Sequence, residues 1–223
     1  MILFQIDTTA IDAAVAPEQV TLINLVLAGG LTMIPLALLG IIAVYIIGER
    51  LLNIRKAGAD PTQLFNEVKS AVLEGSIERA RGICAREDSP ISRILEKGIN
   101  KLGRDIKHIE AAIENAGKIE VYKLEKNLGL LATISGAGPM VGFYGTVVGM
   151  ISAFIAIAQE EGSVSPKLLS SGIYEAMITT AAGLIVGIIA YIGYNYLVTQ
   201  VQKVTYNMEL TTIEFLDLLE KPH

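Results

Sequence analysis

The chain has 223 residues, of which 52% are hydrophobic and 18% are charged, and its formal net charge is −5. Soluble domains carry about 25% charged residues, so this composition is unlike that of an ordinary soluble protein. The acidic balance, with no basic and aromatic patch, gives no support to nucleic-acid binding. Cys84 is the single cysteine, and His108 and His223 lie far apart, so we expect no metal site and no cofactor.

Three long stretches of the chain contain no charged residue at all. They cover residues 19–48, 127–159 and 176–202, which is 30, 33 and 27 residues. A helix needs about 20 apolar residues to cross a bilayer, so each stretch is long enough. We therefore predict an all-α membrane protein whose three transmembrane helices occupy residues 20–48, 127–159 and 172–202.

Residues 1–19 precede the first span and are expected to form a periplasmic segment. Asp7, Asp12 and Glu18 stand there among apolar residues, which suits either an amphipathic helix on the membrane surface or a frayed tail. No Lys or Arg precedes Arg50, so the basic region of a cleaved signal is missing. The first span is therefore expected to stay in the mature protein and to continue as a helix to Lys56.

Residues 49–126 are expected to form a cytoplasmic helical domain. Asp60 followed by Pro61 is typical of a helix start, and further helices are expected from Ser76, from about Ile91 and from about Asp105. The last of these has no sequence break before the second span, so one continuous helix is predicted there. The long helices would then extend from the membrane into a cytoplasmic bundle.

The charge distribution predicts the orientation. Fifteen of the eighteen basic residues lie between Arg50 and Lys126, and positive charge marks the cytoplasmic side of an inner membrane. The N-terminus and the link at 160–171 are then periplasmic, and the tail at 203–223 is cytoplasmic.

Small residues surround one hydroxyl in each of the second and third spans. On a helical wheel, the face of Thr146 carries Ser135, Gly138, Gly142, Gly149 and Ala153. The face of Thr180 carries Ala176, Gly183, Gly187, Ala190 and Tyr194. The pairs Gly138/Gly142, Gly145/Gly149 and Gly183/Gly187 fit the spacing that lets helices approach closely. Either the threonines only bond backbone carbonyls in a packed interface, or they line a polar path.

Glu175 stands at the start of the third span, with Thr179 one turn further along the same face. A charged group at membrane depth costs roughly 2.5–3.5 kcal/mol and usually serves a function. The alternative is that Glu175 caps the span at the interface, where a helix N-terminus favours negative charge. No phosphate-binding loop and no Ser–His–Asp group is present, so we expect no enzyme.

These residues resemble those of a known family. The segments LATISGAGPMVGFYGTVVGM at 131–150 and GIYEAMITTAAGL at 172–184, then Tyr194-Asn195, are similar to the MotA/TolQ/ExbB proton-channel family on its ExbB/TolQ side. Cys84 with SPISR at 89–93 is also similar to that family. The similarity covers roughly residues 20–205.

The resemblance implies a homopentamer in membrane lipid, whose pore holds helices of an ExbD/TolR-type single-span partner with an intramembrane Asp. Thr146 and Thr180 would be pore-wall hydroxyls and Glu175 the acidic residue of the third span. The complex would use the proton motive force to energise outer-membrane transport or envelope maintenance, through a TonB- or TolA-like protein that spans the periplasm.

Two positions depart from the family pattern. Gly138 precedes Pro139 where Ala or Ser is usual, and Thr179 replaces a small apolar residue. An extra hydroxyl oxygen suits Na⁺ as well as a water-mediated proton path, because hard cations prefer oxygen ligands. A sodium-driven motor of the same family and a non-conducting membrane scaffold therefore stay open as alternatives.

Overall fold

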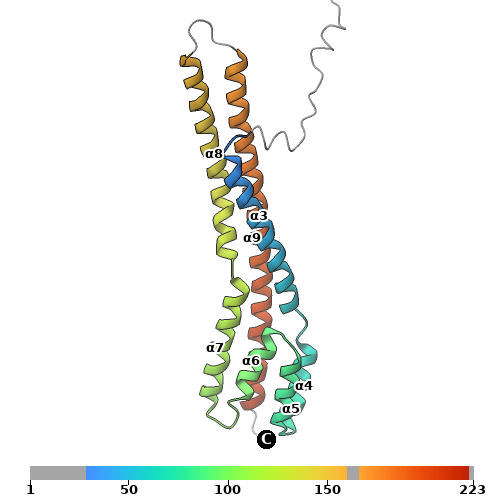
Figure 1. The fold of residues 1–223 in the computed structure, drawn as a ribbon. Coiled ribbons are helices and arrows are strands. Elements are labelled where there is room, and N and C mark those ends of the chain that lie inside the picture. Colours follow the sequence, from blue (N-terminus) through green and yellow to red (C-terminus); the bar gives the residue numbers. More distant parts are fainter. Residues whose placement is uncertain (1–28, 160–165, 221–223) are drawn as a thin grey trace, which may run out of the picture. The chain divides into compact units, whose positions relative to one another are not determined.

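The computed structural model describes residues 29–159 and 166–220, and every regular element in these residues is an α-helix. The helices are α3 Met33–Ala57, α4 Thr62–Leu73, α5 Ile77–Arg86, α6 Pro90–Ile99, α7 Ile106–Glu125, α8 Leu128–Gln159 and α9 Pro166–Glu220 (Figure 1). Three stretches are long and apolar enough to cross a membrane, namely Met33–Leu73, Ile106–Gln159 and Ser170–Glu220. The predicted all-α fold with three candidate spans is confirmed. Residues 1–28 and 160–165, where the N-terminal segment and half of the link were predicted, lie outside the described residues.

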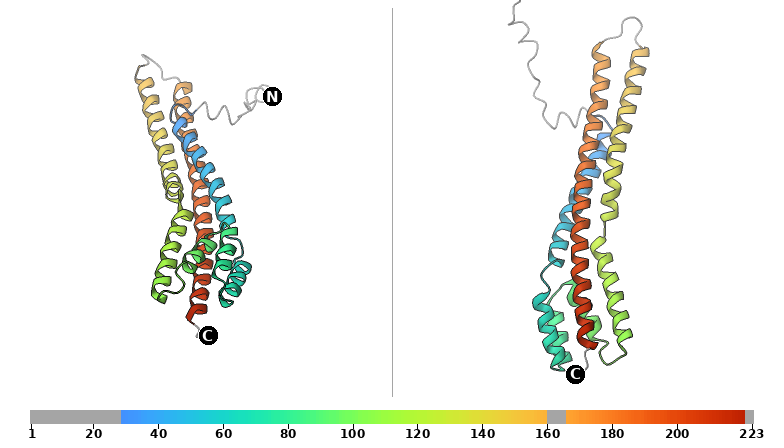
Figure 2. Two further views of the ribbon diagram at one scale, coloured as in Figure 1. Left: turned by 60° about the horizontal axis from the view of Figure 1, so that its bottom comes forward. Right: turned by 180° about the vertical axis from the view of Figure 1, so that it is seen from behind.

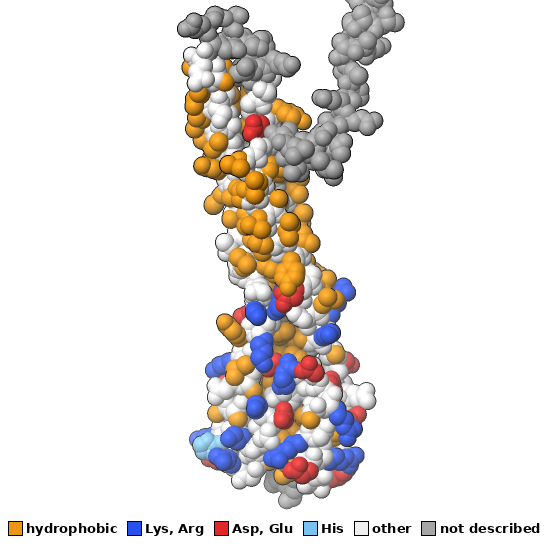
Figure 3. Space-filling view, viewed as in Figure 1, with side chains coloured by type: hydrophobic (Ala, Val, Ile, Leu, Met, Phe, Trp, Pro, Cys, Tyr) orange, Lys and Arg blue, Asp and Glu red, His pale blue; other side chains and the backbone are white. Residues whose placement is uncertain are grey.

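The helices divide between two compact units. The first unit holds residues 29–37, 139–159 and 166–184 of the described chain, and the second holds 38–138 and 185–220. Large apolar side chains of α8 are exposed in the first unit, among them Met140, Phe143 and Ile151. The surface over α4–α7 of the second unit instead carries both signs of charge (Figure 3). Exposed apolar side chains in such number are favourable in lipid and unfavourable in water.

Helix α3 begins at Met33, after an irregular turn at residues 29–32. The turn contains Gly30 with a φ of +64°, and the N–H of Met33 donates to the Gly30 carbonyl at 3.2 Å. From there α3 continues without interruption to Ala57. The predicted helical continuation beyond the first span is therefore present, while residues 20–28 of the predicted span are not described.

The short helices of the second unit begin where the capping residues indicate. The Asp60 carboxylate accepts the hydroxyl of Thr62 at 2.6 Å and the N–H of Thr62 at 3.0 Å, and these bonds, the hydroxyl first, hold the pKa of Asp60 below its usual value. Ser89 and Ser92 form a reciprocal capping box at the start of α6. These local bonds satisfy N–H groups that the first turn of a helix leaves without partners.

The predicted continuous helix from about Asp105 into the second span is wrong. Helix α7 ends at Glu125 and α8 begins at Leu128. Between them Lys126 is extended, with φ −51° and ψ 134°, and Asn127 has a φ of +65°. Asn is the non-glycine residue that enters this left-handed region most readily, because its short amide bonds the local backbone. The hydrophobic period runs through the break, which is why periodicity did not reveal it.

Helix α9 has 55 residues and includes most of the segment predicted as a C-terminal tail. From Leu197 onward its buried side chains recur at spacings of four and three residues. They are Leu197, Val201, Val204, Met208, Thr211, Phe215 and Leu218. In Figures 1 and 2 this half of α9 passes between α7 on one side and α4 and α5 on the other. The heptad pattern explains why the helix continues beyond the third span.

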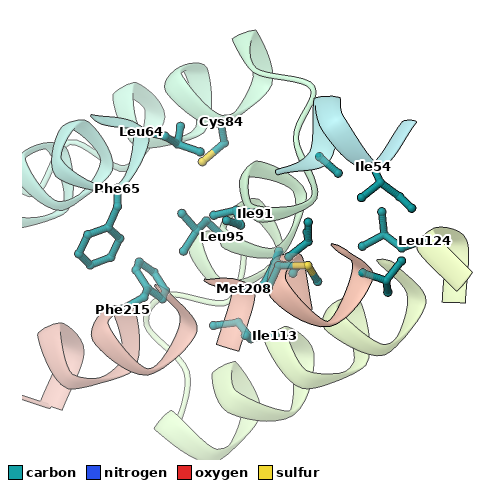
Figure 4. Close-up of a cluster of buried hydrophobic side chains, with 14 of the residues drawn as sticks. Ile54, Leu64, Phe65, Cys84, Ile91, Leu95, Ile113, Leu124, Met208 and Phe215 are labelled. Atoms are coloured by element: carbon teal, nitrogen blue, oxygen red, sulfur yellow. The ribbon is translucent and has the colours of Figure 1, made fainter. Parts of the chain in front are cut away.

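The core of the second unit gathers around α9 (Figure 4). Phe215 is fully buried, and Leu95 of α6 and Ile113 of α7 are each 1% exposed. Added Cβ atoms at Gly98 would lie 2.7 Å from Ile113 Cδ1 and 2.9 Å from Phe215 Cε1. Truncating Phe215 to Ala is expected to cost about 3–5 kcal/mol, since the cavity has no neighbour free to fill it.

Polar bonds around a buried carboxylate link three helices of this unit. Glu120 of α7, whose side chain is 6% exposed, accepts hydrogen bonds from Arg93 of α6 and from Lys123, each at 2.7 Å. Arg50 of α3 donates to the Lys123 carbonyl at 3.2 Å. Burial raises the pKa of Glu120, but the bonds from Arg93 and Lys123 outweigh it and leave that pKa below its ordinary value. The carboxylate therefore stays ionised and joins α6 to α7, while the bond from Arg50 to the backbone joins α3 to α7.

Candidate functional site

In the first unit α8 and α9 run side by side, and their contact is made of small residues (Figures 1 and 2). A Cβ added at Gly142 would lie 2.9 Å from the Thr179 carbonyl oxygen and 3.0 Å from Cα of Gly183. A Cβ added at Gly149 would lie 3.1 Å from Cβ of Ala176. Ordinary van der Waals contact is 3.4–4 Å, so even a methyl group would push the two helices apart. These glycines set the distance between α8 and α9.

Two threonine hydroxyls meet across this contact. Thr146 Oγ1 of α8 and Thr180 Oγ1 of α9 are hydrogen-bonded to each other, and either can be the donor. Thr146 also donates to the Ala176 carbonyl at 3.0 Å, and Thr180 donates to the Gly142 carbonyl at 3.2 Å. Thr146 lies 3.4 Å from its own Gly142 carbonyl. Each hydroxyl therefore reaches the carbonyl four residues before the other threonine.

The cluster has more oxygen atoms than protons. Each hydroxyl supplies one proton and can accept two, so two protons are shared among the two hydroxyls and the carbonyls of Gly142 and Ala176. At most one of these protons lies between the two hydroxyls, so at least three of their four lone pairs have no donor within the cluster. An oxygen-rich point of this kind can accept a hydrogen bond from water or contact a cation, and its two protons can exchange acceptors.

Thr179 lies beside Thr180 in sequence but on another side of α9. Its side chain is 1% exposed, and Oγ1 donates to the Ala176 carbonyl at 2.8 Å. A Cβ at Gly145 would lie 2.6 Å from Thr179 Oγ1 and 3.0 Å from Thr32 Oγ1. The hydroxyls of Thr179 and Thr32 thus converge on Gly145, where α8, α9 and the turn before α3 meet.

Glu175 is exposed and lies one turn before Thr179. Its carboxylate rests against Gly30 in the turn before α3, where a Cβ would collide with Oε1 and stand 3.2 Å from the carboxyl carbon. The four residues predicted for the ion path therefore separate into two pairs. Thr146 and Thr180 bond each other, whereas Thr179 and Glu175 lie toward residues 29–32.

The remaining predicted packing residues lie within α8 and α9. Gly138 and Gly187 are buried, and Pro139 lies inside α8. Proline has no N–H, so the carbonyl of Ser135 loses its helical partner there. Within the described residues no group of three or more His, Cys, Asp and Glu side chains could hold a metal ion.

Sequence reasoning missed Gly30 and Thr32. Neither lies in the two spans that carried the polar stripes, and Thr32 was hidden in an apolar run. The available signal was the pair Gly29-Gly30 directly before a long apolar helix, which marks an irregular turn. That signal fixes a turn but not the helix against which it packs.

Known proteins resemble this chain over most of its length. The model of the MotA/TolQ/ExbB proton channel family matches residues 86–210. A biopolymer transport protein ExbB homolog of Methanothermobacter thermautotrophicus is 28% identical over 191 residues, which cover 85% of this chain and 67% of the relative. The ExbB-like protein 1 of Synechocystis is 32% identical over 184 residues, covering 81% of this chain and 72% of the relative. The Tol-Pal system protein TolQ of Haemophilus influenzae is 32% identical over 116 residues, covering 52% and 50%.

The family match covers α6 to α9 with the hydroxyl pair and Glu175. Together with the three apolar helices it establishes a multi-pass membrane protein. This chain belongs to the MotA/TolQ/ExbB proton channel family.

Proposed function

We propose that this chain is the pore-wall subunit of an ExbB/TolQ-like motor in the cell inner membrane. With an ExbD/TolR-type single-span partner it uses the proton motive force to energise outer-membrane transport or envelope maintenance. A TonB- or TolA-like protein would carry the work across the periplasm. The names of the relatives, which are biopolymer transport and Tol-Pal system proteins, support this class of function.

The hydroxyl pair of Thr146 and Thr180 is the observation that carries the proposal. It is a polar cluster that joins α8 to α9 in a contact built largely from Gly and Ala. Its surplus of acceptors suits a chain of water molecules, in which each oxygen passes on a hydrogen bond.

The proton-carrying carboxylate has to come from a partner. The stretches 127–159 and 176–202 contain no ionisable acid, and Glu175 lies at one end of them. A proton that crosses the bilayer by titration needs a carboxylate at depth. An intramembrane Asp on the partner would supply it, and the threonine pair would order water beside it.

Protons are the proposed coupling ion, and sodium is the alternative. The hydroxyls of Thr32 and Thr179 beside Gly145 favour the alternative, because they add oxygen atoms of the kind that hard cations bind. Measuring uptake in sodium-free medium separates the two, since a sodium-driven motor stops there and a proton-driven one continues.

The proposed topology follows from the basic residues. The basic residues of 49–126 support a cytoplasmic location for the short helices of the second unit. The link between α8 and α9 would then be periplasmic. The proposed spans remain residues 20–48, 127–159 and 172–202. In the described chain α9 already begins at Pro166 and runs on to Glu220, so the third span would be a part of a much longer helix.

A homo-oligomer, five-fold as in the proposed family complex, is supported by an apolar groove in the second unit. The groove lies between α7 and α9 and has a volume of about 780 Å³. Ile113, Val121, Met208 and Leu216 contribute to its apolar lining. Its rim is mainly acidic, with Glu110, Glu114, Glu125 and Glu209. A second copy of this chain, rich in basic residues between Arg50 and Lys126, is the proposed occupant.

The runner-up is a non-conducting scaffold. Its support is that both hydroxyls already have backbone acceptors, so the contact is satisfied without water. In that case the threonines would stabilise the helix pair and carry no ion.

Replacing the hydroxyls tests the proposal against the scaffold. Thr146→Val and Thr180→Val keep the side-chain volume and remove the hydroxyl. Thr133→Val in α8 and Thr199→Val in α9 are matched controls, because these exposed hydroxyls only bond the carbonyl four residues before them. Energy-dependent uptake should fall for the first two variants and stay normal for the controls, with equal amounts of assembled complex. Full uptake in Thr146→Val and Thr180→Val would favour the scaffold.

A further inference from the structure

The turn before α3 lies along one side of α9. A Cβ at Gly29 would lie 3.4 Å from Ile178 Cγ2, and the Glu175 carboxylate rests against Gly30. Thr32 and Thr179 share the space beside Gly145. Three positions of one short turn thus meet consecutive turns of α9, on the side that carries Glu175 and Thr179.

Gly30 is glycine for two separate reasons. Its φ of +64° is left-handed, which strains residues with a side chain. Its missing Cβ also leaves the space that the Glu175 carboxylate occupies, since that Cβ would collide with Oε1. The first reason is common to every left-handed glycine, whereas the second is specific to this contact.

Two other glycines distinguish the backbone strain from the contact with the carboxylate. Gly75 has a φ of +72° and Gly103 a φ of +86°, and an added Cβ at either would meet nothing within 4 Å. Alanine at those positions suffers only the backbone strain. Alanine at Gly30 suffers that strain and also displaces the carboxylate.

We propose that Gly30 is a positioning residue for Glu175. Because Gly30 has no side chain, the carboxylate can lie against the turn before α3, away from the pair of Thr146 and Thr180. The positive end of a helix dipole favours a negative group at such a place. In this position the carboxylate is exposed and its charge is available to a partner helix or a neighbouring subunit. This role rests on the proposed function of Glu175.

The proposal predicts that the length of the side chain at position 175 determines whether a methyl group at position 30 is tolerated. Glu175→Asp shortens the side chain by one carbon–carbon bond, about 1.5 Å, and withdraws the carboxylate from the position of the added methyl. Asp at position 175 should therefore partly restore a Gly30→Ala variant. It should do nothing for Gly75→Ala, which places its methyl in open space.

The test is a double-mutant cycle on the full-length chain in its own membrane and after purification in mild detergent. The variants are Gly30→Ala, Glu175→Asp and their combination, with Gly75→Ala alone and with Glu175→Asp as the matched cycle. The melting temperature and the yield of folded protein are measured for each. We expect Gly30→Ala to lower both by more than Gly75→Ala does, and the combination with Glu175→Asp to regain part of the loss. Additive effects in both cycles would overturn the positioning role, and so would a Gly30→Ala variant whose folding Glu175→Asp does not rescue.

Uptake measurements distinguish this proposal from the function on which it rests. If Glu175→Gln abolishes uptake and the cycle is additive, Glu175 has its function and Gly30 does not position it. If the cycle shows coupling while Glu175→Gln leaves uptake intact, the contact exists and the proposed role of Glu175 fails. Coupling together with a several-fold loss of uptake in Gly30→Ala, partly recovered by Glu175→Asp, supports both.

Discussion

Thr146 and Thr180 bond each other and each also reaches the carbonyl four residues before the other, at 3.0 Å from Thr146 and 3.2 Å from Thr180. Because α8 and α9 follow each other in the chain as a hairpin, this reciprocal arrangement holds two antiparallel helices in one register. Sliding either helix would break the contact between the hydroxyls and both bonds to the carbonyls together. The pair therefore fixes the register of the two helices and also forms a polar part of their contact.

The reciprocal bonds predict that Thr146→Val and Thr180→Val are not additive in stability. Each single variant leaves the other hydroxyl with fewer partners and should cost about 1 kcal/mol. The double variant should lose less than the sum, because the second substitution removes a group already deprived of its partner. Melting temperatures of the four proteins check this, and the same cycle on Thr133 and Thr199, whose hydroxyls bond only their own helices, should be additive. Additivity at Thr146 and Thr180 would mean that the two hydroxyls act separately.

Cys84 is predicted to be unreactive in the folded protein. It is 3% exposed, and burial, with smaller effects from Glu96 and Glu87, raises the pKa of its thiol to about 12. The thiolate is the nucleophile, so maleimide should label it only after denaturation. Labelling of the native protein at neutral pH would contradict this.

Because of this burial, the native cysteine does not report which side of the membrane it occupies. Cysteines introduced at exposed positions do so, for example His108→Cys before the middle of α7 and Ala158→Cys near the end of α8. An impermeant reagent applied outside should label Ala158→Cys in intact cells, and His108→Cys only after the membrane is opened. The opposite pattern would reverse the proposed orientation.

Glu120 is predicted to make the second unit less stable in acid. The folded-state pKa of Glu120 is lowered from its ordinary 4.5 by Arg93 and Lys123, against the effect of burial. A lowered pKa means stability that is present above about 4.5 and lost as the pH falls through the folded value. Glu120→Gln should cost about 1–2 kcal/mol at neutral pH and should reduce the acid sensitivity. Glu114→Gln, whose carboxylate pairs with Lys118 in solvent, is the control and should melt as the wild type does.

The groove between α7 and α9 predicts a variant that disrupts assembly. Ile213 lines the groove and is 56% exposed, whereas Ile119 of α7 is 57% exposed and does not line it. Ile213→Asp should lower the mass measured by native mass spectrometry toward that of a single copy, because a charge is costly in a buried interface. Ile119→Asp should leave the assembly intact. Equal masses for both variants would exclude this groove as the interface.

The break at Asn127 predicts that glycine is tolerated at this position and that a β-branched residue is not. Asn127→Gly should be neutral, since glycine adopts a φ of +65° freely. Asn127→Val should cost about 1–2 kcal/mol, because a β-branched side chain fits poorly in that region. Melting temperatures decide the matter, and a stabilising Asn127→Val would mean that α7 and α8 join into one helix.

Much of the architecture is determined locally and was therefore predictable. Charge-free length identified the three candidate spans, and Asp60 and Asp105 marked the starts of two helices through capping bonds that each residue makes with its neighbours. The seven buried positions of α9 at heptad spacing could also be recognised in the sequence, although residues 203–223 were predicted as a tail. The break at Asn127 was not, because a hydrophobic pattern can continue across a single left-handed residue.

The sequence by itself determined which residues share a face of one helix, since 100° per residue follows from the hydrogen-bonding of the helix alone. It placed Thr180 with Ala176 and Gly183, and the contact with α8 uses that face. Only the tertiary structure decided which neighbour each face meets. Glu175 and Thr179 turn toward residues 29–32, while Thr180 turns toward Thr146. That choice depends on how three helices pack at once, and packing is a property of side-chain shapes brought together from distant parts of the chain.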